Sequence, residues 1–288
     1  MAGPYFIVDL SAWEGTRPNF DAIAAAPNHV GCIIKATQGV SYSPSWFTEN
    51  WPRVRVAGGE RYGSSWFRSC YHYAEPTPSG AAQADYLLRA VDRAGGWGPG
   101  DFPPAWDLEG PKWTSRQQIV DVSSQFSERI RQQIGRAPIL YTGSVWRKFN
   151  VTEKAGFTKM WTPHMDNMAR VGWLNESIVL HQYVGDGKYW NPAGKPAKLG
   201  YPTSVPGLSA KVDMNVVMDR GVPAASIERV YAVLFGNGYA PAIDRPMADR
   251  PTAAPSRGGV SVPVILGVGA GLLALGILIA SAGRDELV

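Results

Sequence analysis

The sequence predicts an α/β fold, an irregular TIM-like (β/α) barrel in which some late helices are missing. Roughly the first 220 residues alternate short apolar runs with helical patterns. Several runs are apolar throughout, as parallel strands covered on both faces should be. The later runs lie closer together, and the helical patterns between them are weak. The expected strands are Tyr5–Leu10, Cys32–Thr37, Ser69–Ala74, Pro104–Glu109, Ile139–Thr142, Met160–His164, Ile178–Tyr183 and Val212–Asn215.

The clearest helical pattern covers Thr114–Ile134, where apolar residues recur at spacings of three and four. Thr114 and Gln117 have the spacing of a capping box, and Gly135 follows as a stop signal. The other expected helices are Ser79–Ala94 and Pro223–Phe235, while residues 185–207 have the composition of a long surface loop.

The C-terminal part of the chain has a different composition from the rest. Val260–Ala282 contains 23 residues without a charge, which at about 1.5 Å per residue is enough to span a hydrocarbon core of roughly 30 Å. The preceding stretch is rich in Pro, Ala, Arg and Gly and buries little apolar surface. We therefore expect a barrel domain at 1–238, a disordered linker at 239–259, a transmembrane helix at 260–282 and a short tail at 283–288.

Composition excludes some classes of function. The net charge of +4 suits an anionic polymer such as a bacterial wall, although scattered surface charge explains it equally well. No run rich in Lys and Arg indicates nucleic acid. The four histidines show no HxxxH spacing and the two cysteines no CxxC spacing, so we expect neither a metal nor a cofactor.

Polar or aromatic residues close each of the eight apolar runs. In a barrel the carboxyl ends of the strands converge on one face, where an active site forms. Eight polar ends in succession therefore predict one shared pocket. These residues are Asp9, Lys35, His72, Asp107 with Glu109, Tyr141, His164, Gln182 with Tyr183, and Asp213 with Asn215.

Asp107 and Glu109 are two residues apart on one expected strand, so their side chains point to the same face. Two close carboxylates do not ionise independently, and the pKa of one rises while the other stays charged. Glycoside hydrolysis needs that asymmetry, because an acid protonates the leaving oxygen and an anion faces an oxocarbenium-like centre. Asp9 and Asp213 end the first and last strands, which are neighbours in a closed barrel.

An ordered set of motifs over roughly residues 4–220 resembles glycoside hydrolase family 25, the muramidases of bacteria and their phages. The resemblance implies a flattened barrel and cleavage of the β-1,4 bond from N-acetylmuramic acid to N-acetylglucosamine. The matching stretches are Val8–Gly15, Lys35–Gly39, Tyr71–Ala74, Ala82–Ala84, Trp106–Glu109, Pro138–Thr142, Met160–Trp161, His181–Tyr183 and Val212–Asn215.

The resemblance also implies roles for individual residues. Glu109 is expected to be the general acid, and Asp107 to stabilise the transition state or orient the substrate acetamido group. Asp9 and Asp213 complete the acidic pocket. Family members retain configuration, with either an Asp or the substrate acetamido group as nucleophile. The candidate substrate contacts are Lys35, Tyr71, His72, Tyr73, Trp106, Tyr141, Trp161, Gln182 and Tyr183, any of which could instead pack in the core.

The sequence departs from the family pattern in three places. Glu14 stands where the family often has Gln, Gln38 stands where it often has Glu, and the arginine-rich segment Arg53–Ser69 is longer than usual. A family 18 chitinase-type barrel is disfavoured because no further acids precede Asp107 at spacings of two. The remaining alternative is a membrane-tethered, non-catalytic wall-binding or virion-associated module on the same barrel.

The apolar C-terminal span suggests a phage endolysin for host lysis, anchored in the host inner membrane. We read no signal peptide at the N-terminus. Arg245, Arg250 and Arg257 precede the span, so the positive-inside rule places the barrel on the cytoplasmic side until lysis or until the span reorients. Gly267 and Gly271 form a GxxxG pair that permits helix association.

Overall fold

The computed structural model describes residues 3–14, 17–57, 66–98, 100–163, 177–185, 188–189, 201–208 and 212–236. The expected linker, transmembrane helix and tail lie outside these residues, as does most of the expected loop at 185–207. Within the described ranges, no helix has both the length and the apolar character needed to cross a bilayer.

Eight strands form a closed barrel whose order follows the sequence. β1 to β7 are parallel neighbours, and β9 pairs antiparallel with both β1 and β7, which closes the ring. Short strands β8 and β10 extend β7 and β9 as antiparallel partners. The strands are β1 (Phe6–Leu10), β2 (His29–Gln38), β3 (Phe67–Tyr73), β4 (Ala105–Leu108), β5 (Ile139–Thr142), β6 (Lys159–Thr162), β7 (Ile178–Gly185), β8 (Lys188–Tyr189), β9 (Asp213–Asp219) and β10 (Val222–Pro223).

The predicted barrel is confirmed, and its first and last main strands are neighbours as expected. The direction of β9 is the part that the apolar runs do not indicate. A parallel pair needs a long crossover connection, whereas an antiparallel pair does not. The weak helical patterns late in the sequence are consistent with this antiparallel closure.

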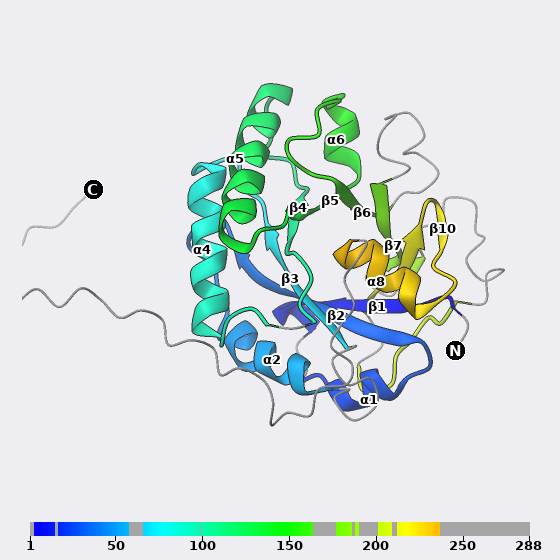
Figure 1. Cartoon of the computed structure of the whole chain (residues 1–288). Coiled ribbons are helices and arrows are strands. Elements are labelled where there is room, and N and C mark those ends of the chain that lie inside the picture. The colour runs from blue at the N-terminus through cyan, green and yellow to red at the C-terminus, as the bar shows by residue number, and fades with distance from the viewer. Residues whose placement is uncertain are drawn as a thin grey trace, which may run out of the picture. The chain divides into compact units, whose positions relative to one another are not determined.

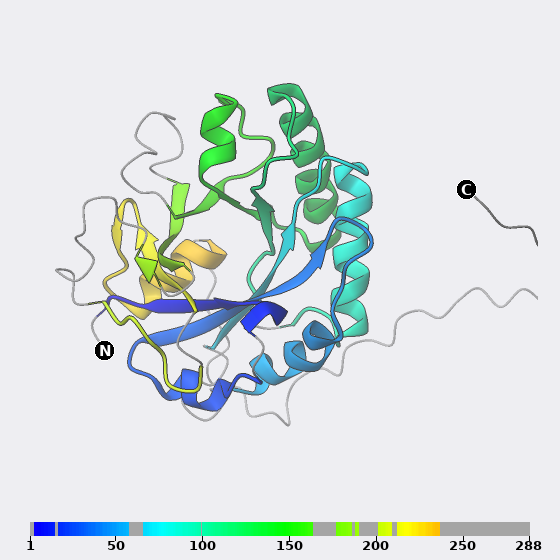
Figure 2. The same ribbon diagram turned by 180° about the vertical axis from the view of Figure 1, so that it is seen from behind.

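Helices cover the outside of the barrel (Figure 1). In both views α4 and α5 run side by side along one flank, and α1 and α2 lie near one another at another part of the rim (Figure 2). The helices are η1 (Ala12–Glu14), α1 (Phe20–Ala25), α2 (Ser45–Val56), α4 (Gly80–Arg93), α5 (Arg116–Ile134), α6 (Ser144–Lys148) and α8 (Ile227–Phe235).

The N-cap residue of α5 is Ser115, one residue after the predicted cap, Thr114. The Gln118 N–H donates to Ser115 Oγ at 3.1 Å, and Gln118 Oε1 in turn accepts from the backbone of Thr114 at 3.1 Å. Ser115 thus caps Gln118 as in a capping box, but the Gln118 side chain bonds back to Thr114, the residue before the cap, and the predicted pair of Thr114 and Gln117 does not form. Gly135 ends the helix in the left-handed conformation, as predicted.

Two apolar layers fill the domain. Side chains that point outward from the strands pack beneath the helices, and side chains that point inward fill the barrel. Val230, Tyr231 and Leu234 of α8 belong to the inner layer, so this helix covers the amino ends of the strands (Figure 1). The carboxyl ends are left for polar side chains.

Candidate active site

Acidic side chains gather at the carboxyl ends of β1 and β4 and at the amino end of the antiparallel strand β9, on the inner face of the barrel. Asp9 and Asp107 are buried, Asp213 is half-buried, and Glu109 is exposed just beyond the end of β4. Each strand alternates inner and outer side chains, and these four positions share the inner parity of their strands. The structure therefore brings together the four acids that the sequence predicted.

Asp107 is the most strongly perturbed member of this group. Its side chain is 5% exposed, and its Oδ1 atom has no hydrogen-bond partner. Burial, followed by the negative charge of Glu109, raises the pKa of Asp107 well above its ordinary value, while the charge of Lys35 opposes the rise. Asp107 therefore holds a proton more readily than an ordinary carboxyl, and Glu109 is the member of the pair that solvent reaches.

The phenol of Tyr141 is affected by the negative charge of all four acids. Burial and the charges of Glu109, Asp107, Asp9 and Asp213, in that order, raise the pKa of its phenol. The Tyr141 hydroxyl therefore stays protonated and able to donate a hydrogen bond. The four carboxylates therefore all lie close enough to this one phenol to affect its pKa.

Amide side chains fix the orientation of Asp213 and Asp9. The Tyr141 hydroxyl donates to Gln182 Oε1 at 2.7 Å, and Gln182 Nε2 donates to Asp213 Oδ2 at 2.9 Å. A second chain runs from Trp161 Nε1 to Asn215 Oδ1 at 2.6 Å, and from Asn215 Nδ2 to Asp9 Oδ2 at 2.7 Å.

Each of these two acids thus accepts a hydrogen bond from an amide that is itself held by an aromatic side chain. Such support holds a carboxylate oxygen in place without adding a charge to the pocket. The ring of Trp161 is buried beneath Tyr141 and Tyr71, with centroid distances of 4.6 and 6.2 Å, and forms the floor of the pocket.

Lys35 supplies positive charge from β2, the strand between β1 and β3. Its Nζ lies 4.7 Å from the centroid of the Tyr73 ring and donates to Gln38 Oε1 at 3.3 Å. Gln38 Nε2 donates to Glu75, and Glu75 pairs with Lys112 at the surface, at 2.9 Å. The ammonium group is thereby held between an aromatic face and an amide, close enough to Asp107 to affect its pKa.

Tyr73 stands between Lys35 and the acids. Burial and the charges of Glu109, Asp107 and Glu75 raise the pKa of its phenol to about 12. Gly110 follows Glu109 with a φ of +83°, and a Cβ atom there would fall 2.5 Å from the Tyr73 hydroxyl. A glycine is thus required for both the turn and the close approach.

Three of the predicted substrate contacts face away from the pocket. His72 and Trp106 are fully buried on the outer face, where their rings stack 5.4 Å apart against α5. His72 bonds to Thr37 and Gln83, and burial lowers its pKa to about 4. Tyr183 is also on the outer face, and its hydroxyl donates to the Pro202 carbonyl at 2.9 Å.

A role for these three side chains as sugar contacts is therefore wrong. Each adjoins an inward residue on its strand, and adjacent strand residues point to opposite faces. The remaining candidates occupy the inner face or floor of the pocket, and their contact with a substrate stays a prediction. They are Lys35, Tyr71, Tyr73, Tyr141, Trp161 and Gln182.

Two further residues of the site were not among the predicted site residues. Asn215 was recognised only as a polar strand end, yet it holds Asp9 and Trp161 together. Trp13 lies on η1, directly beyond the carboxyl end of β1, and is 83% exposed. An aromatic residue a few positions after a strand-ending acid is the sequence signal that could have identified Trp13.

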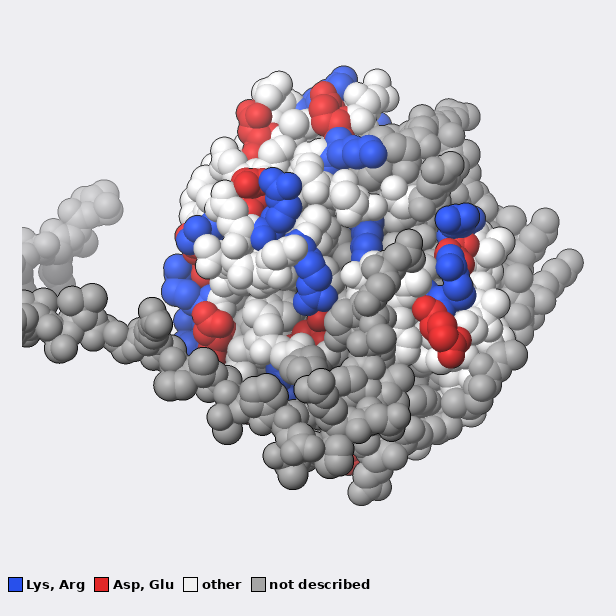
Figure 3. All heavy atoms as spheres, viewed as in Figure 1, with Lys and Arg blue, Asp and Glu red and all other residues white. Residues whose placement is uncertain are grey.

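Surface charge outside the pocket is mixed. Over α4 and α5, described Lys and Arg side chains alternate with Asp and Glu on the face shown in Figure 3. The net positive charge is therefore scattered on this face. Within the described part of the chain, no group of three or more His, Cys, Asp or Glu side chains is arranged to hold a metal ion.

Comparison with known proteins supports the fold and the family resemblance. The family model of glycosyl hydrolases family 25 matches residues 8–190, which is more than half of the chain. The chain is 34% identical over 148 residues to the N,O-diacetylmuramidase of Chalaropsis sp, an alignment that covers 48% of this chain and 65% of that enzyme. It is 27% identical over 161 residues to the uncharacterised protein YegX of Escherichia coli O6:H1, covering 54% and 55% of the two chains.

The solved structures agree in fold. The bacterial lysozyme from Streptomyces coelicolor superposes with a TM-score of 0.62 and 24% sequence identity, covering 82% of this chain and 98% of that one. The chain spans only about half of the length of YegX and about two thirds of the length of the N,O-diacetylmuramidase.

Proposed function

The chain belongs to glycosyl hydrolases family 25, and we propose that it is a peptidoglycan hydrolase of the muramidase type. It would cleave the β-1,4 bond between N-acetylmuramic acid and N-acetylglucosamine. The observation that carries this proposal is the buried Asp107 beside the exposed Glu109, with Asp9 and Asp213 on the same inner face of the barrel. Burial also raises the pKa of Asp107. That arrangement supplies both a proton and negative charge.

Glu109 is the proton donor in this proposal. It is the exposed member of the pair and can reach an oxygen in a bound glycan, whereas Asp107 is almost inaccessible. Glu109 transfers its proton to the glycosidic oxygen as the bond from that oxygen to C1 breaks. The electron pair of that bond stays on the oxygen, and the departing sugar leaves as an alcohol.

Asp107 and Glu109 share protons as one unit in this mechanism. Before substrate binds, burial and then the charge of Glu109 favour the protonated form of Asp107 by raising its pKa. A bound sugar removes water from Glu109 and favours its protonated form, so the shared proton passes from Asp107 to Glu109. Asp107 is then available as the anion that faces, or orients a group toward, the positive charge that develops at C1.

Asp9 and Asp213 provide the remaining negative charge. Their oxygens are held by Asn215 and Gln182, so they need little rearrangement as positive charge develops in the sugar ring. Tyr71, Tyr73 and Tyr141 lie near these acids. Their ring faces can stack on the C–H face of a sugar ring, and their hydroxyls can hydrogen-bond to sugar oxygens.

Product analysis tests the reaction. Purified peptidoglycan is digested, and the new reducing ends are reduced and identified. A reducing end on muramic acid supports the muramidase, and one on glucosamine contradicts it. The Glu109→Gln variant serves as the control. If it releases products as fast as the parent, Glu109 is not the proton donor. If neither protein releases products, the barrel is a non-catalytic wall-binding or virion-associated module.

We further propose that the enzyme is a membrane-anchored phage endolysin. Support comes from the uncharged, apolar composition of Val260–Ala282 and the flexible composition of 239–259. The arginines before the span favour a barrel held on the cytoplasmic side of the host inner membrane until lysis. Gly267 and Gly271 would allow spans to associate within the bilayer.

Membrane fractionation followed by protease treatment of spheroplasts tests the anchor and its orientation. The proposal expects the full chain in the membrane fraction and a barrel protected from protease added outside. A version in which Leu272 and Leu275 are replaced by Arg should leave the membrane fraction, because a charge at the bilayer centre is costly. A barrel digested from outside before lysis would contradict the held-back orientation.

A further inference from the structure

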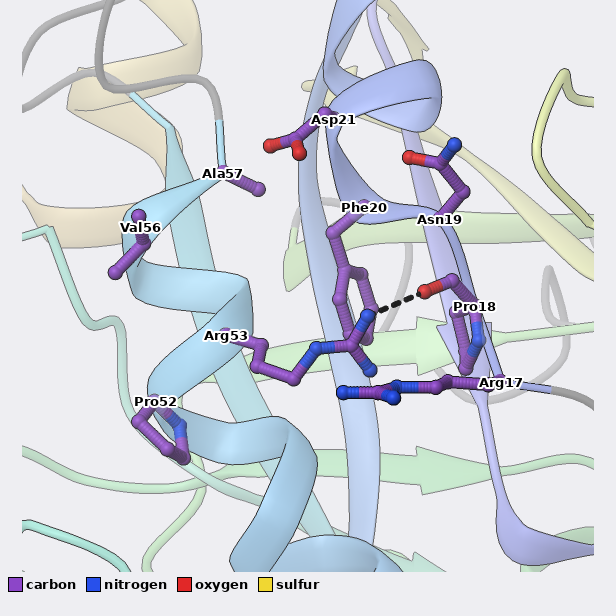
Figure 4. A pocket seen from close by; sticks show the side chains of 9 residues that line it. All are labelled: Arg17, Pro18, Asn19, Phe20, Asp21, Pro52, Arg53, Val56 and Ala57. Atoms are coloured by element: carbon purple, nitrogen blue, oxygen red, sulfur yellow. Dashed lines mark hydrogen bonds between the residues drawn. The ribbon is translucent and has the colours of Figure 1, made fainter.

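A second pocket lies on the outside of the barrel, away from the acids. It has a volume of about 550 Å³ and is formed between the start of α1 and the last turns of α2. None of its residues belongs to the acid pocket. Its size is in the range of sites for small ligands. The lining residues are Arg17, Pro18, Asn19, Phe20, Asp21, Pro52, Arg53, Val56 and Ala57 (Figure 4).

Two guanidinium groups extend toward one another in this pocket from its two walls (Figure 4). Arg53 is fixed in place, because its Nη1 donates to Asn50 Oδ1 at 2.5 Å and its Nη2 to the Pro18 carbonyl at 2.9 Å. The guanidinium also lies 5.2 Å from the centroid of the Phe20 ring. Arg53 thus keeps further N–H donors unused in a preset orientation.

Arg17 contributes the second positive charge. Within the described chain it makes neither a hydrogen bond nor an ion pair, and its side chain is exposed. Burial, followed by the positive charge of Arg17, lowers the pKa of Arg53. Arg17 is therefore close enough to repel Arg53. Two like charges are therefore held near one another with nothing in the described chain seated between them.

The nearby acids do not neutralise the arginines by direct pairing. Asp21 lines the pocket and Glu49 is one turn before Arg53, and both act on Arg53 from a distance. In the described part of the chain, no ion pair joins either acid to Arg17 or Arg53. An anion that enters between the two guanidiniums gains charged hydrogen bonds and relieves their repulsion.

The walls indicate what accompanies the anion. Pro18, Pro52 and Val56 supply apolar surface, and Val56 is 76% exposed although it is a large aliphatic residue. Guanidinium forks match phosphate geometry with two parallel N–H bonds. A phosphate attached to a polyol or sugar would accept hydrogen bonds from the two guanidinium groups through its oxygens. The C–H groups of the polyol or sugar would pack against the apolar side chains.

We propose that this pocket binds the phosphate groups of a phosphodiester-linked bacterial wall polymer and so holds the enzyme on its substrate. The inference rests on the proposed function only in its choice of the wall as the source of phosphate. The occupancy of the pocket by phosphate is independent of the catalytic residues.

Direct titration tests the site first. Glycerol 3-phosphate is added to the parent protein and to Arg17→Ala, and binding is measured by calorimetry. Loss of one charged, forked contact should weaken binding about tenfold or more. Asp21→Asn should strengthen binding, because it removes a competing negative charge. Arg89→Ala is the matched control, since Arg89 is an exposed arginine on α4 and should leave binding unchanged.

Binding to walls tests the biological source of the phosphate. The Glu109→Gln background prevents digestion, and co-sedimentation is compared on walls with their phosphodiester polymer and on walls from which it has been removed. The parent pocket should retain several-fold more protein on intact walls, and Arg17→Ala should abolish that difference. Equal retention on both walls, or stronger binding to phosphatidylglycerol vesicles than to intact walls, would overturn the wall-polymer assignment.

Failure of this proposal is distinguishable from failure of the proposed function. Hydrolysis of soluble, phosphate-free glycan strands depends on the acid pocket alone and should be the same for the parent and Arg17→Ala. If glycerol 3-phosphate binds the parent, Arg17→Ala and Arg89→Ala equally, the arginine pocket is not a phosphate site, whatever the hydrolysis assay shows.

Discussion

Two buried carboxyl groups lie six residues apart in the segment that forms β4, and the chain treats them in opposite ways. Asp101, before the amino end of the strand, accepts two bonds from Arg68 at 2.5 and 2.7 Å, one from Arg55 at 3.1 Å and one from the Gly98 N–H at 2.7 Å. Asp107, near the carboxyl end, has one oxygen with no hydrogen-bond partner. The first carboxylate is paired with two arginines, and the second has an oxygen that makes no hydrogen bond.

The difference separates stability from function within one short stretch of chain, from Asp101 before β4 to Asp107 in it. A fully paired charge holds the base of the barrel together, where Arg68 also lies 3.6 Å from the centroid of the Trp51 ring. An under-bonded carboxyl costs free energy in the folded state and holds a proton that chemistry can use.

Asp101→Asn should be the most destabilising change. Removing one partner of a buried ion pair leaves Arg68 charged and unpaired in the core, at a cost of about 3–5 kcal/mol. For a domain of this size that lowers Tm by roughly 6–20 °C. Thermal unfolding followed by circular dichroism measures the effect.

The control for that experiment is Asp85→Asn, which removes a half-exposed partner of Arg129. An exposed ion pair contributes about 1 kcal/mol or less, so this variant should melt near the parent. Equal loss of stability in the two variants would show that the buried position of Asp101 has no special importance.

Asp107→Asn should act on catalysis. The amide keeps the shape of the protonated carboxyl but can neither share a proton with Glu109 nor carry negative charge. We expect kcat/KM on peptidoglycan to fall about 100-fold or more, equivalent to about 2.7 kcal/mol. Steady-state hydrolysis measures it, and a variant that keeps more than a third of the parent activity would remove Asp107 from the mechanism.

The same substitution should stabilise the fold at neutral pH. The native pKa of Asp107 is raised above its ordinary value of 3.8, so the stability that its protonation provides is complete below about pH 3.8 and is lost as pH rises through the native pKa. Asn is neutral throughout. The Tm of Asp107→Asn should thus match the parent near pH 4 and exceed it by an amount that grows toward pH 8.

The size of that gain follows from burying an unsatisfied charged oxygen, about 1–3 kcal/mol. Melting curves at several pH values test it against the parent. If the two proteins differ by a constant amount at every pH, Asp107 does not titrate over that window and the assignment of its proton is wrong.

The contrast between Asp101 and Asp107 also shows what could be inferred from the sequence. Asp107 was found because a strand places Asp107 and Glu109 on one face, and strand alternation is local. Asp101 was not found, because its partners Arg55 and Arg68 come from α2 and β3, and no spacing rule connects residues brought together only by folding.

The same limit explains the errors in the site. Motif membership selected Trp106 together with Asp107, and His72 together with Tyr71 and Tyr73, although neighbours on a strand cannot all point inward. An irregularity in the pairing of β2 and β3, between Lys35 and Thr37, lies next to this region. Eight apolar runs were enough to predict a barrel, but they do not encode the direction of β9.

Replacing Trp13 should have the smallest effect of these changes, and it tests whether the substrate contacts the protein beyond the four acids. Trp13 is 83% exposed on η1, four residues after Asp9, and we expect a glycan strand that leaves the acids to contact its ring. A stacking contact of about 0.5–1.5 kcal/mol predicts that Trp13→Ala lowers kcat/KM on long glycan strands roughly threefold to tenfold. Trp13→Phe keeps a flat ring and should retain most of the activity. Because the ring lies outside the acid pocket, hydrolysis of the shortest cleavable fragments should change little, and an equal loss on short and long substrates would place Trp13 within the catalytic apparatus rather than on the path of the strand.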